Sequence, residues 1–199
     1  MRKIIFEHIT LACHCRTLEK WAMRIFQLHM MTWAFFTLFF SVHAETSPSP
    51  GKGFRLCRVE NITSSIQPNM DASRYGLNRL LDGILPKNGW RSTWTAWYQV
   101  DPVITFDLGR ECRVGAIRLF FQAMARDDEL KSVEVAVSKE GQEFHLFNEY
   151  GEIVTSVETG TWVELNLQSV RARYFQLKPH FQGWGHQWGE VEFWELQGK

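Results

Sequence analysis

The sequence predicts an all-β fold, an antiparallel sandwich or jelly roll, on three observations. Short apolar segments recur over residues 54–196, and several of them alternate apolar and polar side chains. Turn-forming residues separate these segments, as at 108–109 and 159–160. No segment between them carries a helical period longer than a turn or two, near residues 75–81. Strands at this spacing without intervening helices are typical of sandwiches and jelly rolls.

The expected strands follow one another along the chain. Their segments are FRLCRVE (54–60), VITFDLG (103–109), VGAIRLFFQ (114–122), SVEVAVS (132–138), WVELNL (162–167), RYFQLK (173–178) and GEVEFWEL (189–196). In SVEVAVS, Val133, Val135 and Val137 share one face, because side chains alternate along a strand. The same rule turns Phe175 and Leu177 inward. The alternation therefore predicts side chains that line the core.

The front of the chain is predicted to be a targeting segment. From Met23 to Ala44, a basic start, an apolar run and a small-x-small site follow in the order of a secretory signal. The apolar run is shorter than the roughly 18 to 20 residues that cross a bilayer, which favours a cleaved signal over a membrane anchor. Cleavage near Ala44 would make the protein secreted, extracellular or periplasmic. The expected organisation is an extension plus signal over 1–44 (signal core 23–44), a Ser/Pro/Gly linker over 45–53 and one domain over 54–199.

The charge of the mature segment, residues 45–199, limits its partners. It has 17 basic and 20 acidic residues, a net charge of −3, and no basic stripe, so nucleic acid is not expected. The negative net charge also argues against an anionic membrane surface. We do not expect an enzyme, because the segment has no G-x-S-x-G, no H-E-x-x-H and no glycine-rich phosphate loop.

Two cysteines remain in the mature segment, Cys57 and Cys112. An exported protein meets an oxidising environment, in which cysteines on neighbouring strands can form a disulfide. Two buried apolar thiols are the alternative, and the sequence leaves both open.

Aromatic residues in two expected loops are the candidates for ligand binding. Trp97 and Tyr98 lie in TAWYQ, and Trp184 and His186 lie in the glycine-rich GWGHQ. An indole face suits the apolar C–H face of a sugar ring, while polar neighbours bind its hydroxyls. Core packing is the alternative for every tryptophan. Trp94 is expected to be buried.

The motifs of the chain also occur in a characteristic order. They are LLDG (80–83), WRSTW (90–94), VDPVITFDLG (100–109), VGAIRLF (114–120), VEVAVSKEGQEF (133–144), VRARYFQLK (170–178) and GEVEFWEL (189–196). This order resembles the discoidin, or coagulation factor 5/8 type C, family and the related galactose-binding-like carbohydrate-binding modules. The resemblance covers about residues 54–198. It implies an eight-stranded jelly-roll sandwich that recognises ligands with the loops at one end and has no catalytic residues.

The resemblance also implies the partner class. Members bind glycans or, in the clotting-factor branch, anionic membranes, so a glycan or glycoconjugate is the expected partner. Adhesion to a membrane surface or a protein is the alternative, as is an accessory role in a glycan-degrading system. In relatives the loop after VGAIRLFFQ helps to form the ligand end, which adds Arg126 and Asp127 to the candidates. A solvated polar loop is the other interpretation of that pair.

One structural calcium is implied for many relatives, near the residues that match Asp82 and Glu190. Calcium prefers oxygen ligands, and an Asp-Gly turn offers a carboxylate and free carbonyls. Here residues 84–87, Ile-Leu-Pro-Lys, replace the usual short polar stretch after Asp-Gly. This difference leaves the calcium an open question.

Overall fold

The computed structural model describes residues 50–69, 76–86, 94–125, 128–151, 153 and 159–198. All of them belong to the second of the two units of the chain, Ser47–Lys199. The expected signal segment and most of the linker lie outside the described residues, so their assignment stays a prediction. Within the described ranges, no helix has the length and apolar character of a membrane span.

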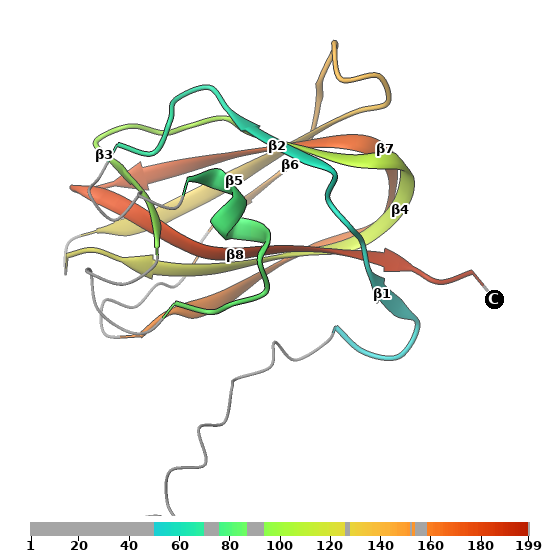
Figure 1. The fold of residues 1–199 in the computed structure, drawn as a ribbon, viewed down its shortest axis with the longest axis horizontal. Coiled ribbons are helices and arrows are strands. Elements are labelled where there is room, and N and C mark those ends of the chain that lie inside the picture. The colour runs from blue at the N-terminus through green and yellow to red at the C-terminus, as the bar shows by residue number, and fades with distance from the viewer. Residues whose placement is uncertain are drawn as a thin grey trace, which may run out of the picture. The chain divides into compact units, whose positions relative to one another are not determined.

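The described residues form eight strands and one short 3-10 helix (Figure 1). The elements are β1 (Phe54–Leu56), β2 (Asn61–Ser64), η2 (Leu77–Leu81), β3 (Thr95–Tyr98), β4 (Ile104–Ala123), β5 (Glu129–Ser138), β6 (His145–Gly151), β7 (Thr161–Gln182) and β8 (Gly185–Leu196). The strand order is β1-β8-β4-β7-β5-β6, with β2 paired to β4 and β3 paired to β8. Every pair is antiparallel, which confirms the predicted fold class.

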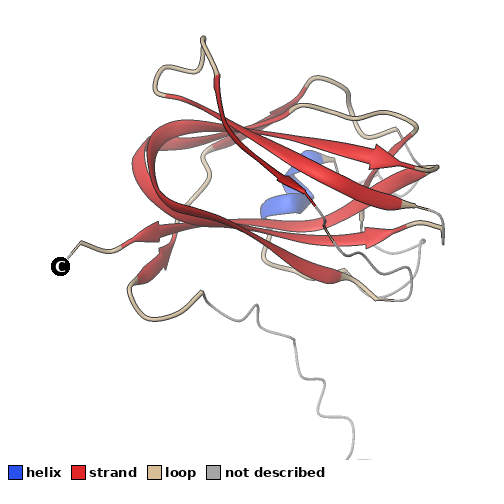
Figure 2. Ribbon diagram, turned by 180° about the vertical axis from the view of Figure 1, so that it is seen from behind, coloured by secondary structure: helices blue, strands red, loops and turns tan. Residues whose placement is uncertain are grey.

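Strands β4 and β7 are long because each belongs to both layers of the sandwich. Figure 2 shows the two strands curling together at one end of the sheet. Their pairing shifts register between Asp107 and Cys112, and such irregularities bend strands. Gly109 lies in this bend with φ 70°, and a Cβ there would approach Glu60 Cγ to 2.3 Å. The positive φ therefore favours glycine in this bend. Below, this side of the molecule is called the bend end, and the opposite side, where β7 meets β8, the loop end.

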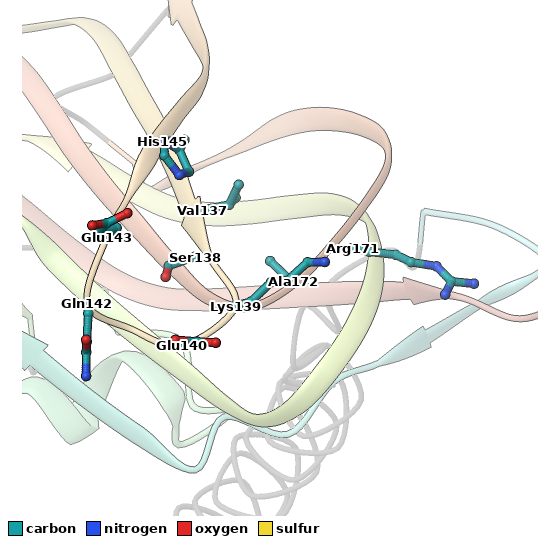
Figure 3. A pocket seen from close by; sticks show the side chains of 9 residues that line it. All are labelled: Val137, Ser138, Lys139, Glu140, Gln142, Glu143, His145, Arg171 and Ala172. Atoms are coloured by element: carbon teal, nitrogen blue, oxygen red, sulfur yellow. The ribbon is translucent and has the colours of Figure 1, made fainter.

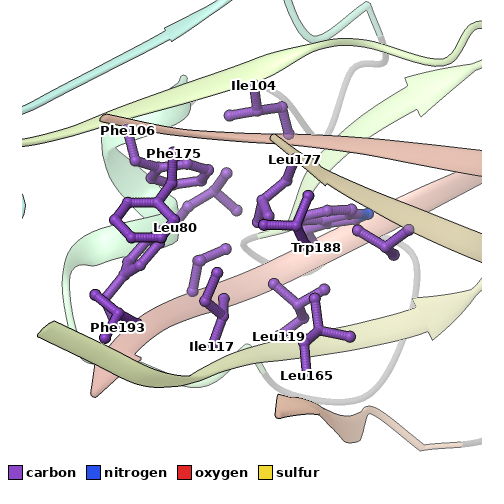
Figure 4. Close-up of a cluster of buried hydrophobic side chains, with 14 of the residues drawn as sticks. Leu80, Ile104, Phe106, Ile117, Leu119, Leu165, Phe175, Leu177, Trp188 and Phe193 are labelled. Carbon is purple, nitrogen blue, oxygen red and sulfur yellow. The ribbon is translucent and has the colours of Figure 1, made fainter. Parts of the chain in front are cut away.

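The core fills the space between the layers (Figure 4). Phe106 and Phe175 come from one layer and meet Phe193 of the other, with ring centroids 5.0 and 5.3 Å from it. Burying such a side chain stabilises a fold by about 1.5–3 kcal/mol. Trp94 is buried as predicted, and so are most of the residues that alternation turned inward. Val137 is only partly buried, at the edge of the core.

The strand predictions were wrong in several details. The segment 54–60 holds only the short β1, and the predicted pairs 103–109 with 114–122 and 162–167 with 173–178 are each one continuous strand. The TAWYQ segment, expected as a loop, forms β3 against β8. Residues of β3 are buried on both faces and those of β6 are nearly all exposed, so neither strand alternates.

Cys57 and Cys112 are neighbours at the bend end. Both thiols are buried, and their sulfurs and a carboxylate oxygen of Glu195 all lie within 4.8 Å of one another. The cysteines are unpaired in this structure, so the disulfide stays a prediction. Burial raises the pKa of Cys57 to about 12 and also raises the pKa of Cys112. Neither thiol is therefore ionised and reactive at neutral pH once the protein has folded.

Candidate functional site

Trp184 presents the most exposed aromatic ring of the described residues, with 63% of its surface accessible. It lies in the two-residue turn that joins β7 to β8 at the loop end. A single exposed apolar side chain is common on protein surfaces. What distinguishes Trp184 is how firmly its backbone is held.

Hydrogen bonds fix the Trp184 backbone on both sides. Its N–H donates to Asp128 Oδ1 at 2.5 Å, and its carbonyl accepts from the Gln99 N–H at 2.9 Å. Asp128 is only 3% exposed, and its second oxygen accepts from the Ala125 N–H at 2.7 Å. One buried carboxylate thus ties the β4–β5 turn to the β7–β8 turn. The backbone that carries the indole is therefore held in place by the fold.

Gly183 allows this close approach. Its φ is 120°, and a Cβ on it would lie 2.1 Å from Asp128 Oδ1 and 2.8 Å from Asp128 Cα. Any side chain would push the turn away from its anchor. The glycine before the tryptophan therefore belongs to the architecture of the site.

Tyr98 lies beside Trp184 in an edge-to-face arrangement, with ring centroids 5.9 Å apart and an interplanar angle of 64°. Its N–H donates to Asn69 Oδ1 at 2.7 Å, and Asn69 Nδ2 donates to the Tyr98 carbonyl at 3.2 Å. The exposed Gln99 follows it with φ 54°. We call Asn69, Tyr98, Gln99 and Trp184 the aromatic corner. It combines two aromatic rings with the exposed Gln99, a combination that suits a sugar.

Trp97 and His186 correct the sequence prediction, because both side chains are fully buried. They face each other across the β3–β8 pair, with stacked rings 5.5 Å apart. Burial lowers the pKa of His186 to about 4, so its ring is neutral at physiological pH. Neither side chain has surface to offer a ligand, and the predicted contact role is wrong for both. They pack instead against other buried rings, among them Trp188.

The structure does not contradict the other predicted binding residues. Tyr98 and Trp184 come together at the surface, and their binding role stays a prediction. Arg126 and Asp127 lie outside the described residues, so their role is also untested. Sequence reasoning missed Asp128, Asn69 and Gln99. Asp128 directly follows Arg126 and Asp127 in the sequence, but its role depends on a contact with Trp184 that no local pattern reveals.

Asp82 and Glu190 meet around Gly83. Glu190 Oε2 accepts from the Gly83 N–H at 3.0 Å, and Asp82 Oδ1 accepts from the Ile84 N–H at 2.9 Å. Asp82 also pairs with Arg79. Glu190 is 5% exposed, and its burial, with the nearby Asp82 charge, raises its pKa to about 8. Two adjacent carboxylates suit a divalent cation, although Arg79 already compensates one of them.

Two hollows lie at the bend end. One, of about 500 Å³, is lined by Val137, Ser138, Lys139, Glu140, Gln142, Glu143, His145, Arg171 and Ala172 (Figure 3). It mixes both signs of charge and has no large aromatic ring to stack on a sugar. The other, of about 640 Å³, is lined by Arg55, Leu56, Arg58, Glu60, Leu108, Gly109, Arg110 and Arg173. The second hollow is therefore rich in arginine.

Comparison with known proteins places this architecture. The model of the F5/8 type C domain matches residues 61–196. No curated protein matches the chain.

Solved structures with the same fold have low sequence identity. The truncated AlyQ with CBM32 and alginate lyase domains is 14% identical, with a TM-score of 0.56, covering 73% of this chain and 34% of that one. The chain thus spans about a third of that protein (34%). The F5/8 type C domain of a Bacteroides fragilis protein is 15% identical, with a TM-score of 0.54 and coverage of 74% and 100%. A CBM32 of Clostridium perfringens in complex with GalNAc-β-1,3-galactose is 17% identical, with a TM-score of 0.51 and coverage of 67% and 93%.

Proposed function

Because the chain belongs to the F5/8 type C domain family, we propose that it is a carbohydrate-binding module whose aromatic corner holds a sugar ring. The observation that carries this proposal is the exposed Trp184 indole on a backbone bonded at both its N–H and its carbonyl. Structural neighbours support the class, since one was solved with GalNAc-β-1,3-galactose bound. A turn whose backbone is already fixed avoids the entropy cost of ordering a loop on binding.

Each residue of the aromatic corner has a different role in the proposed sugar binding. The Trp184 face contacts the C–H face of the sugar, and Tyr98 limits how far the ring can slide. Gln99 is exposed, follows Tyr98 and bonds the Trp184 carbonyl through its N–H, so its side-chain amide is available to donate to and accept from hydroxyls. Asn69 already spends its amide on the Tyr98 backbone, so it positions the corner rather than the ligand.

The proposed role is non-catalytic. Asp128 is the buried acid beside Trp184, and both of its oxygens accept backbone N–H bonds. A carboxylate engaged in this way orients a turn and is not free to act as a general acid or base. Binding without turnover, after export and signal cleavage near Ala44, is the function that we propose.

Adhesion to an anionic membrane surface is the second candidate. The observation in its favour is Ile84, an exposed apolar side chain in the loop after η2. One apolar tip on a chain of negative net charge is a weak membrane anchor, because anionic lipid attracts basic residues. An accessory role beside a glycan-degrading enzyme is compatible with either binding mode.

Calcium binding at Asp82 and Glu190 is proposed as a structural feature of the same module. Two carboxylates on one turn support this proposal, because calcium prefers oxygen ligands and a bound cation would favour the charged form of Glu190. In this account Asp82 and Glu190 would hold the ion with backbone oxygens. Calcium would keep Glu190 ionised and so fix the η2 loop.

The test is a glycan array probed with the wild type and Trp184→Ala, with Phe147→Ala as the matched control. Phe147 is also an exposed aromatic residue, but it lies on β6. We expect Trp184→Ala to weaken the strongest sugar signal about tenfold or more and Phe147→Ala to leave it unchanged. Binding to phosphatidylserine vesicles with no sugar signal would replace the proposal by the adhesion alternative.

A further inference from the structure

The arginine hollow at the bend end gathers side chains from four segments. We use this name for the 640 Å³ hollow lined by Arg55, Leu56, Arg58, Glu60, Leu108, Gly109, Arg110 and Arg173. Arg55 comes from β1, Arg58 from the β1–β2 connection, Arg110 from the β4 bend and Arg173 from β7. Four guanidinium groups around one hollow are a feature that the proposed sugar contact with Trp184 does not use.

Two of these arginines share one carboxylate. Glu195 Oε2 accepts from Arg55 at 2.7 Å and from Arg110 at 2.6 Å, and its Oε1 accepts from Arg110 at 3.0 Å. Hydrogen bonding from Arg110, and then from Arg55, lowers the pKa of Glu195 to about 2, so it is a full anion at neutral pH. Two positive charges thus meet one negative charge, which leaves one positive charge uncompensated.

The other two arginines do not remove this excess. Arg173 and Asp107 form a bidentate pair, at 2.7 and 2.9 Å, and balance each other. Arg58 forms an ion pair with Glu60 at 3.7 Å, which is too long for a hydrogen bond, and the Arg58 side chain is 85% exposed. Arg58 therefore keeps its guanidinium donors for a ligand.

The hollow also offers an apolar surface and a fixed wall. Leu56 is half exposed beside the arginines. Gly109 lies against the Glu60 side chain and forms the wall on that side. An inorganic anion has no use for the leucine, whereas a sugar ring does. Guanidinium groups bind carboxylates in a bidentate geometry.

A bound metal ion is a less suitable ligand for this end of the molecule. The cluster of Cys57, Cys112 and Glu195 has three metal-ligating atoms close together. Arg55 and Arg110 occupy both oxygens of Glu195, so a metal ion would have to displace them and remain beside two positive charges. The chemistry of this end favours anions.

We propose that the arginine hollow is a second binding site, for a carboxylate-bearing sugar of the uronic acid class. The carboxylate meets Arg58 and the excess positive charge at Arg55 and Arg110, while the ring lies against Leu56. The site is separate from the aromatic corner and does not require it.

The experiment titrates the mature protein calorimetrically with tetragalacturonate and with its methyl ester, which has the same sugars without the charges. The test variant is Arg55→Gln/Arg58→Gln. Arg110 still holds Glu195 in this variant, so the fold is expected to survive, and thermal unfolding checks this. The charge-matched control is Lys131→Gln/Lys139→Gln, which removes two exposed positive charges outside the hollow.

We expect the wild type to bind tetragalacturonate and not the ester, with affinity that falls as salt rises. The dissociation constant should rise about tenfold or more in the arginine variant and less than about twofold in the lysine control. Trp184→Ala should bind tetragalacturonate like the wild type. The proposal is overturned if the wild type does not bind, if the ester binds equally well, or if the lysine control or Trp184→Ala loses as much affinity as the arginine variant.

Discussion

The loop end and the bend end of the sandwich hold their exposed side chains by different means. At the loop end the Trp184 backbone is bonded to Asp128 and Gln99, and the Trp184 side chain carries no charge. At the bend end Arg55 and Arg110 are positioned by ion pairs through their own side chains. The first arrangement depends on backbone geometry and should be insensitive to salt. The second depends on charge and should weaken as salt is added.

The largest expected effect is a dependence of the free energy of unfolding on pH, which arises from Glu190 near the loop end. Folded Glu190, in the half of β8 near the loop end, keeps its proton up to about pH 8, whereas in the unfolded chain its pKa is near 4.5. Between these values the folded state binds more protons. The free energy of unfolding should therefore fall, on the order of 4 kcal/mol, as pH rises from about 4.5 to 8 without calcium.

Urea unfolding across this pH range measures the effect. Glu190→Gln should flatten the profile, and Glu140→Gln, at an exposed turn, should not. Calcium at the upper pH should restabilise the wild type and leave Glu190→Gln unchanged. A wild-type profile that is already flat would show that Glu190 is not held neutral by burial.

The thiols at the bend end provide the next largest effect. If oxidation during folding joins Cys57 to Cys112, the bond restrains the unfolded chain, and reducing it should lower the free energy of unfolding by about 3 kcal/mol. Mass spectrometry of the alkylated protein shows whether the bond forms. Cys57→Ser/Cys112→Ser should match the reduced protein in stability and leave sugar binding at Trp184 intact. Two alkylated thiols in protein from an oxidising compartment would refute the disulfide.

Gly183→Ala gives a smaller effect confined to the loop end. The new Cβ meets Asp128 at a backbone φ of 120°, so the turn must shift, at a cost of about 2 kcal/mol. Sugar binding at Trp184 should weaken with it, while binding in the arginine hollow should not change. Gly198→Ala is the matched control, because a Cβ there meets nothing within 4 Å. Equal losses in both variants would mean that the turn is not specially constrained.

The sequence predicts those strands that have one buried face and one exposed face, because their side chains alternate between apolar and polar. Val133, Val135 and Phe175 alternate with polar residues and are buried as expected. β3 and β6 carry no such pattern, since one is buried on both faces and the other exposed on both. The sequence also did not show that the predicted segments join into the long strands β4 and β7. The bend between the two halves of each strand depends on pairing across the sheet.

The candidate site was predictable only in part, for the same reason. Trp184 follows a glycine in a turn, which local pattern can indicate. Trp97 and His186 lie in similar sequence, but the pairing of β3 with β8 turns both inward. Asp128 acts on Trp184 from 56 residues away, and the arginine hollow draws on four segments. Contacts of this range follow from topology rather than from any stretch of sequence.

We propose that the exposed Trp184, anchored by its backbone, binds sugar at the loop end independently of the arginine hollow. A crossed calorimetric titration tests it most directly, with the best neutral glycan from the array against the wild type, Trp184→Ala and Arg55→Gln/Arg58→Gln. We predict that Trp184→Ala binds the neutral glycan about tenfold or more weakly than the wild type does. The arginine variant should bind it as tightly as the wild type. Unchanged affinity with Trp184→Ala, or an equal loss in both variants, would contradict the account.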